Sequence, residues 1–202
     1  MIATWQKSMQ TLRDFARKEQ SARCELCARE IGENHQHLFD PAKRLVICGC
    51  DGCCLLFDTD GRTKYRRVPR DPRLLGNFHL GDAQWEQLLI PISLGFLYRS
   101  SSANQTIASY PSPFGVVESS IDENAWRAIV AGNAALAELR DDVEALLVNR
   151  LRGQREYFIA PIDRCFQLVG IVRRHWKGMN GGDQVWIEVN QYLAALRKGA
   201  RE

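Results

Sequence analysis

The sequence predicts an α+β protein in which a small cysteine-rich module precedes an antiparallel sheet with helices. Cysteines crowd one stretch near the N-terminus, apolar runs bounded by turn residues follow it, and two long helical patterns close the chain. Strands joined by turns and followed by helices are typical of the α+β class. We therefore expect four parts: residues 1–22, 23–60, 61–84 and 85–202.

The first part, residues 1–22, has the pattern of an amphipathic helix. Trp5, Met9, Leu12 and Phe15 recur at helical spacing, and basic residues lie between them. We expect the apolar face of this helix to pack on the rest of the protein, with docking on a membrane surface or on a partner as the alternatives.

The second part, residues 23–60, is built around two C-x2-C pairs. Cys24 and Cys27 form the first pair and Cys50 and Cys53 the second, with 22 residues between the pairs. Each C-x2-C turn supplies two thiolates from one tight bend, so two such turns complete a tetrahedral zinc site. Strands are expected at 37–40 and 44–48, and a helix or third strand from position 54. This order predicts a treble-clef-like zinc module.

Three nearby residues are rival ligands for the same ion. On a strand, Cys48 would share a face with Cys50, and His35 or His37 can replace a thiolate. Iron–sulfur clusters also use cysteine thiolates, but the common ferredoxin spacings are absent, so zinc is favoured.

The histidine pair between two zinc-binding turns also resembles part of the motif of H-N-H nucleases. In those enzymes one histidine activates water and another helps to hold a catalytic divalent ion. The asparagine and final histidine of the motif are missing here, because residues 54–57 read C-L-L-F. A degenerate nuclease is therefore only an alternative.

The third part, residues 61–84, is basic at its start. The basic residues of this run are Arg62, Lys64, Arg66, Arg67, Arg70 and Arg73. Such a run beside a zinc module can bind nucleic-acid phosphates, but charge runs are more often solvated surfaces. We expect a linker or edge strand. The nucleic-acid alternative requires these side chains to form one exposed face that does not pair with carboxylates of the body.

The fourth part, residues 85–202, has the pattern of a sheet with helices. We expect strands at 88–98, 105–110, 143–151 and 156–160, and helices starting at Asp122, 161 and 181. The two prolines in residues 110–115 predict a rigid loop. Cys165 is expected to be a buried core residue.

Composition and missing motifs restrict the function. The net charge of +3 is modest, and no apolar run is long enough to span a bilayer. Without a secretory signal at the N-terminus we expect a cytoplasmic protein, in which seven cysteines favour metal over disulfides. The sequence has no nucleophile elbow, P-loop or dinucleotide glycine motif, so we expect no enzymatic activity.

Several stretches together resemble one uncharacterised bacterial family that is often encoded beside nickel–iron hydrogenase genes. They include R-C-E-L-C, H-Q-H-L-F-D, I-C-G-C-D-G-C-C, I-P-I-S-L-G-F, Y-P-S-P-F-G and P-I-D-R-C-F-Q-L-V-G. The resemblance implies a role in hydrogenase maturation or assembly, with a hydrogenase subunit, a maturation factor or a second copy of the chain as partner. It implies no catalytic residues, and it supports the cysteine cluster as the metal module.

Overall fold

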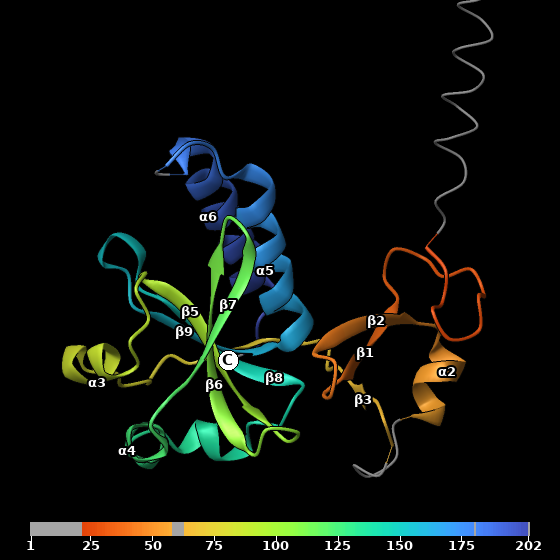
Figure 1. Cartoon of the computed structure of the whole chain (residues 1–202), viewed down its shortest axis with the longest axis horizontal. Helices are drawn as coiled ribbons and strands as arrows, with labels where there is room; N and C mark the ends of the chain where they lie inside the picture. The colour runs from red at the N-terminus through yellow and green to blue at the C-terminus, as the bar shows by residue number, and fades with distance from the viewer. Residues whose placement is uncertain (1–21, 58–62, 180, 202) are drawn as a thin grey trace, which may run out of the picture.

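The structure, a computed structural model, describes residues 22–57, 63–179 and 181–201 (Figure 1). It has the predicted α+β fold, with two antiparallel sheets. The helix predicted over residues 1–22 lies, up to position 21, outside the described residues. None of the helices in the described ranges is long and apolar enough to cross a membrane.

The smaller sheet belongs to the cysteine-rich module. Strand β1 (Gln36–Asp40) pairs with β2 (Leu45–Gly49) on one side and with β3 (Arg66–Arg67) on the other, all antiparallel. Helix α2 (Asp51–Leu56) follows β2. The predicted hairpin is therefore confirmed. After Cys50 the sequence allowed either a helix or a third strand, and the structure has a helix there.

The larger sheet forms the body and has the strand order β4-β9-β8-β5-β6-β7. Each neighbouring pair is antiparallel. The strands are β4 (Arg73–Leu74), β5 (Leu94–Ser100), β6 (Gln105–Ser112), β7 (Gly115–Ser120), β8 (Glu144–Asn149) and β9 (Glu156–Pro161).

Helices cover both faces of this sheet. Helices α5 (Ile162–His175) and α6 (Gly182–Lys198) pack on one face. Helix α4 (Glu123–Ala131), the 3-10 turn Ala134–Glu138 and the segment around α3 (Asp82–Gln87) pack on the other. Successive strand residues point to opposite faces, and both faces of β8 are covered. This is why residues 145–148 of β8 are an unbroken apolar run, with Leu146 and Leu147 in opposite cores.

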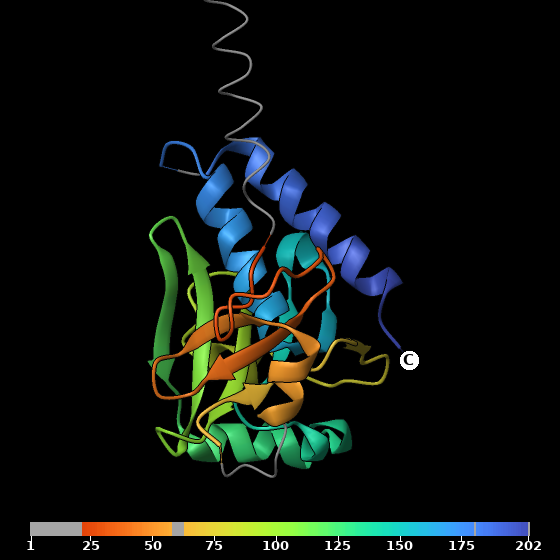
Figure 2. The same cartoon turned by 90° about the vertical axis from the view of Figure 1, so that its right-hand side faces the viewer.

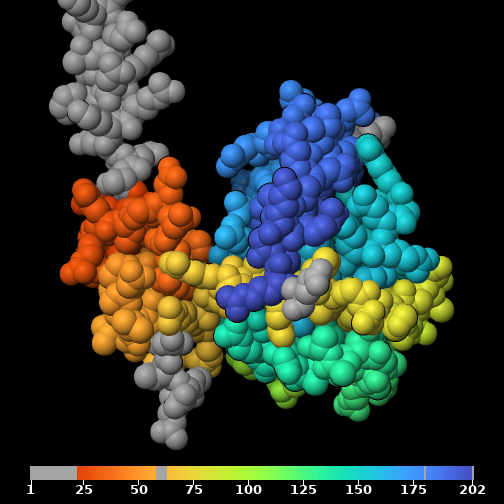
Figure 3. Space-filling view, turned by 180° about the vertical axis from the view of Figure 1, so that it is seen from behind, coloured from red at the N-terminus to blue at the C-terminus, as the bar shows by residue number. Residues whose placement is uncertain are grey.

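The basic segment is divided between the two sheets. Its strand β3 is an edge of the small sheet, and its strand β4 is an edge of the large one. Figure 3 shows this segment (yellow) passing from the module to the body beside helix α6 (dark blue). Within residues 61–84, edge strands therefore cover Arg66–Arg67 and Arg73–Leu74.

Two predicted elements of the body are wrong. The strand expected at 88–98 starts only at Leu94, because Leu89 has a φ of 53° and Leu88 and Ile90 pack into the core under the sheet. The rigid loop expected at 110–115 is a tight hairpin, since β6 continues to Ser112 and β7 starts at Gly115. Gly115 has a φ of 126°, which a residue with a side chain rarely adopts.

The other helices and strands of the body lie close to their predicted positions. Asp122 caps helix α4 by accepting a hydrogen bond from the amide of Asn124 at 3.1 Å. Strands β8 and β9 match 143–151 and 156–160, and Cys165 is fully buried in the core. Helix α5 begins one residue after Pro161, which occupies the N-cap position.

The module lies against the body along helix α5 and the β6–β7 hairpin (Figures 1 and 2). Phe39 of β1 and Val68, which follows β3, belong to the same apolar core as α5 and α6. At the turn after β1, Arg44 forms an ion pair with Glu118 of β7, and the Ser102 hydroxyl donates to the carbonyl of Pro41 at 3.0 Å. The two parts therefore share one core.

Candidate metal centre

The four cysteines selected by spacing come together at one point. Cys24 and Cys27 lie in the turn before the hairpin, Cys50 is the N-cap of α2, and Cys53 lies in its first turn. Their sulfur atoms all lie within 4.8 Å of one another. This arrangement of a turn, a hairpin and a helix start is treble-clef-like.

The spacing of the sulfur atoms fits a tetrahedral ion. Cys27 Sγ lies 3.7 Å from Cys50 Sγ. A zinc ion with Zn–S bonds of about 2.3 Å requires sulfur atoms about 3.8 Å apart, the edge of a regular tetrahedron. The four thiolates could therefore hold zinc or another tetrahedral metal ion with little movement. Four protein ligands leave no coordination position for a substrate, which is typical of a structural site.

Backbone amides prepare two of these thiols for ionisation. Burial raises the pKa of Cys24, but hydrogen bonds from the amides of Cys50, Leu26 and Cys27 outweigh it and lower that pKa to about 6. The amide of Cys53 donates to Cys50 Sγ at 3.5 Å and lowers the pKa of Cys50. The neighbouring thiols of Cys27 and Cys50 in turn raise the pKa of Cys53. A cation is needed before all four can be thiolates together.

A small apolar core holds the two turns in place. Leu38, Ile47 and Cys54 form it, and Leu26, Phe57 and Tyr65 pack against it. Gly49 is needed here because a Cβ at this position would lie 2.5 Å from Cys54 Sγ. Neither Gly49 nor Gly52 has a positive φ, and Gly52 lies within α2, so the close approach of Cys54 is the structural reason for a glycine at position 49.

The remaining cysteines within the described residues are set apart from the four. Burial raises the pKa of Cys54 to about 11, although Arg67 partly opposes this. Complete burial likewise raises the pKa of Cys165. Cys48 does not share a strand face with Cys50, because β2 ends at Gly49 and Cys50 starts the helix. Cys48 instead forms a separate group with His35 and His37, whose donor atoms lie within 4.8 Å of one another.

Residues 23–200 match the sequence profile of a family described as a family of unknown function, DUF5947. The chain belongs to this family. The match spans both the cysteine-rich module and the body, so the two parts occur together in DUF5947. No curated protein and no solved structure matches the chain.

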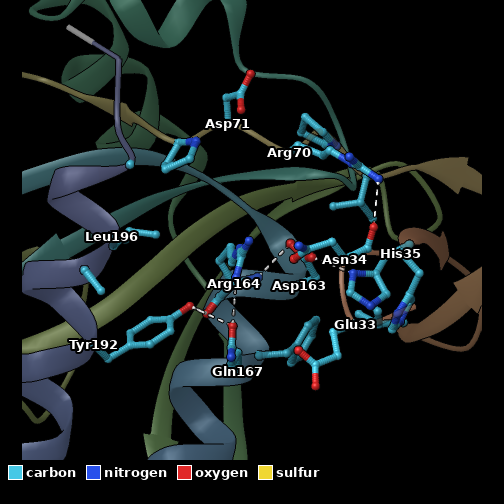
Figure 4. A pocket seen from close by; sticks show the side chains of 18 residues that line it. Glu33, Asn34, His35, Arg70, Asp71, Asp163, Arg164, Gln167, Tyr192 and Leu196 are labelled. Atoms are coloured by element: carbon cyan, nitrogen blue, oxygen red, sulfur yellow. Dashed lines mark hydrogen bonds and ion pairs between the residues drawn. The ribbon is translucent and has the colours of Figure 1, made fainter. Parts of the chain in front are cut away.

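A pocket of about 860 Å³ lies where the module meets helices α5 and α6. Figure 4 shows His35 on the module side and Asp163, Arg164 and Tyr192 on the helix side. Asp163 lies in the first turn of α5, and its Oδ2 accepts a hydrogen bond from His37 Nδ1 at 2.7 Å. No local sequence motif could predict this pocket, because the residues that line it come from segments more than a hundred residues apart in the sequence.

The described side chains of the basic run do not form one unpaired face. Lys64 Nζ lies 3.7 Å from Asp40, and Arg66 Nε lies 4.0 Å from the buried Asp142 of the body. Arg73 contacts Glu138 at 3.1 Å. Of these three contacts, the one between Arg66 and Asp142 joins the module to the body.

Proposed function

We propose that this protein is a zinc-binding accessory protein that acts by contact with another protein, in the maturation or assembly of nickel–iron hydrogenase. The observation that carries the proposal is the closed set of four cysteine sulfurs, all within 4.8 Å of one another. Such a set stabilises a small module and leaves no position for substrate. The hydrogenase context rests on the resemblance of the chain to a family encoded beside those genes.

The contact surface in this proposal is the tip of the β6–β7 hairpin. Phe114 at the tip is 96% exposed, and Val116 and Val117 beside it are each 36% exposed. A phenylalanine side chain that is this exposed is well suited to a pocket on a second protein. The two-residue turn holds it in one position, so little conformational entropy is lost on binding.

The proposal is tested in the native host by affinity purification of the full-length protein and by deletion of its gene. Hydrogenase subunits or maturation proteins should co-purify, and hydrogenase activity should fall on deletion. Wild-type protein should restore the activity, whereas Phe114→Ala should not. Met179→Ala is the matched control, because Met179 is also 96% exposed but lies in a different turn. Normal hydrogenase activity after deletion contradicts the hydrogenase role.

A further inference from the structure

The hairpin of the module places two histidines and a cysteine on one side. His37 in β1 is paired directly with Cys48 in β2, so their side chains share a face of the ribbon. His35 lies two residues before His37, and its side chain points to the same side. The two imidazole rings are 4.7 Å apart between centroids and meet edge to face.

Hydrogen bonds fix which nitrogen of each histidine is free to bind a ligand. His35 Nδ1 lies 2.8 Å from the carbonyl oxygen of Gly32, which can only accept a hydrogen bond. His37 Nδ1 lies 2.7 Å from Asp163 Oδ2, also an acceptor. Both Nδ1 atoms therefore carry the proton of the neutral ring, and both Nε2 atoms have a lone pair. Histidine ligands of metal ions are oriented by this arrangement.

One of these lone pairs is buried without a partner. His35 Nε2 is shielded from solvent and makes no hydrogen bond with any residue that the structure describes. Leaving such an atom unsatisfied is unfavourable, because it has lost its hydrogen bonds to water and gained none in return. His35 belongs to a group whose other members are an imidazole and a thiol, and a metal cation is a ligand that all three can bind.

We propose that His35 Nε2, His37 Nε2 and Cys48 Sγ bind a second divalent ion of the zinc class. The site is separate from the four-cysteine site, and it goes beyond the accessory role proposed above without depending on it. Imidazole nitrogen and cysteine thiolate are each ordinary donors to zinc. Three protein ligands leave the fourth position of a tetrahedral ion to water or another exchangeable ligand, unlike the closed set of cysteines.

Neighbouring residues hold the proposed ligands in place. Both histidines line the pocket between the module and helices α5 and α6, and Figure 4 shows His35 on its module side. Asp163 is the positioning residue, because its carboxylate orients His37 from the start of α5. Glu25 holds Cys48 in place: the Cys48 amide donates to Glu25 Oε1 at 2.8 Å, and the Glu25 amide donates to the Cys48 carbonyl at 2.9 Å.

The test is an anaerobic titration of the full-length protein with Co²⁺, starting from protein whose four-cysteine site is loaded with zinc. One equivalent of Co²⁺ should bind in addition to the zinc. Its spectrum should show the visible bands of the cobalt ion and a near-ultraviolet charge-transfer band from one cobalt–thiolate bond. Azide should shift the cobalt spectrum, because the fourth ligand is exchangeable. Zinc content should stay at about one ion per chain, which separates this site from the closed one.

His35→Ala and Cys48→Ser should abolish the cobalt signal, and Asp163→Asn should weaken cobalt affinity about 10–100-fold while the spectrum keeps its shape. His175→Ala is the control and should bind as the wild type does, since His175 lies at the far end of α5. Cys48→Ser could also disturb the four-cysteine site and lose its zinc. In that case the result for His35→Ala is used to judge the proposal, because His35 lies before strand β1 and its replacement leaves the strands of the hairpin unchanged. The proposal is overturned if the wild type binds no second equivalent, or if His35→Ala binds it as tightly.

Discussion

Phe39 of strand β1 stacks against Phe166 of helix α5, with ring centroids 6.2 Å apart and ring planes 22° apart. Phe39 is fully buried, and its neighbour Leu38 points to the opposite side of the strand, into the small core beside the cysteines. One strand therefore connects the metal module to the core of the body.

Phe39→Ala should lower the free energy of unfolding by about 3–5 kcal/mol, because it leaves a cavity in the shared core. Since module and body share this core, we expect the wild type to unfold in one transition. Denaturant unfolding followed by both tryptophan fluorescence and far-ultraviolet circular dichroism measures this. Leu38→Ala is the matched comparison and should instead reduce zinc retention. Two separate transitions in the wild type would show that the parts fold independently.

Loss of one cysteine of the four should remove the metal and unfold the module. We expect Cys24→Ser and Cys53→Ser to lose the roughly one zinc ion per chain, because a structural zinc site contributes folding free energy directly. Metal analysis of protein purified without oxygen measures the zinc content, and limited proteolysis measures the folding of the module. Cys165→Ala is the control, since Cys165 lies in the core of the body. A brown protein that contains iron and sulfide would contradict the zinc assignment.

Gly49→Ala should destabilise the module by about 1–3 kcal/mol, because the new Cβ would overlap Cys54 Sγ in a packed core. Gly52→Ala is a matched control three residues away, where a Cβ meets nothing within 4 Å. Alanine favours the helical conformation over glycine by up to about 1 kcal/mol, so this control should be neutral or more stable. Thermal unfolding of the zinc-loaded variants measures both effects. Equal effects of the two substitutions would argue against the close approach at Gly49.

Phe114→Ala should leave the free energy of unfolding within about 0.5 kcal/mol of the wild type, because an exposed side chain away from special contacts contributes little to stability. Phe96, which is fully buried in the sheet, is the comparison, and Phe96→Ala should cost about 3–5 kcal/mol. Chemical denaturation measures both. A large loss of stability in Phe114→Ala would mean that its effect on hydrogenase activity could not be read as loss of a contact.

The sequence alone determined the elements with strong local signals. The spacing of Cys24, Cys27, Cys50 and Cys53 predicted which thiols come together, because each C-x2-C turn depends only on neighbouring residues. Helical periodicity with a capping residue predicted α4 at Asp122, and the apolar runs predicted β8 and β9. Local signals failed where burial decided the outcome, as in residues 88–93, whose apolar side chains fill the core under the sheet without forming a strand.

Only the tertiary structure separated the two groups of metal-ligating residues. In the sequence, Cys48, His35 and His37 are rivals for one ion, because all lie within the same short stretch. The pairing of His37 with Cys48 across the hairpin, and the end of strand β2 before Cys50, place them in a group of their own. Asp163, which orients His37, lies 126 residues away in the sequence. Such a contact depends on how the body folds against the module, and sequence spacing carries no information about that packing.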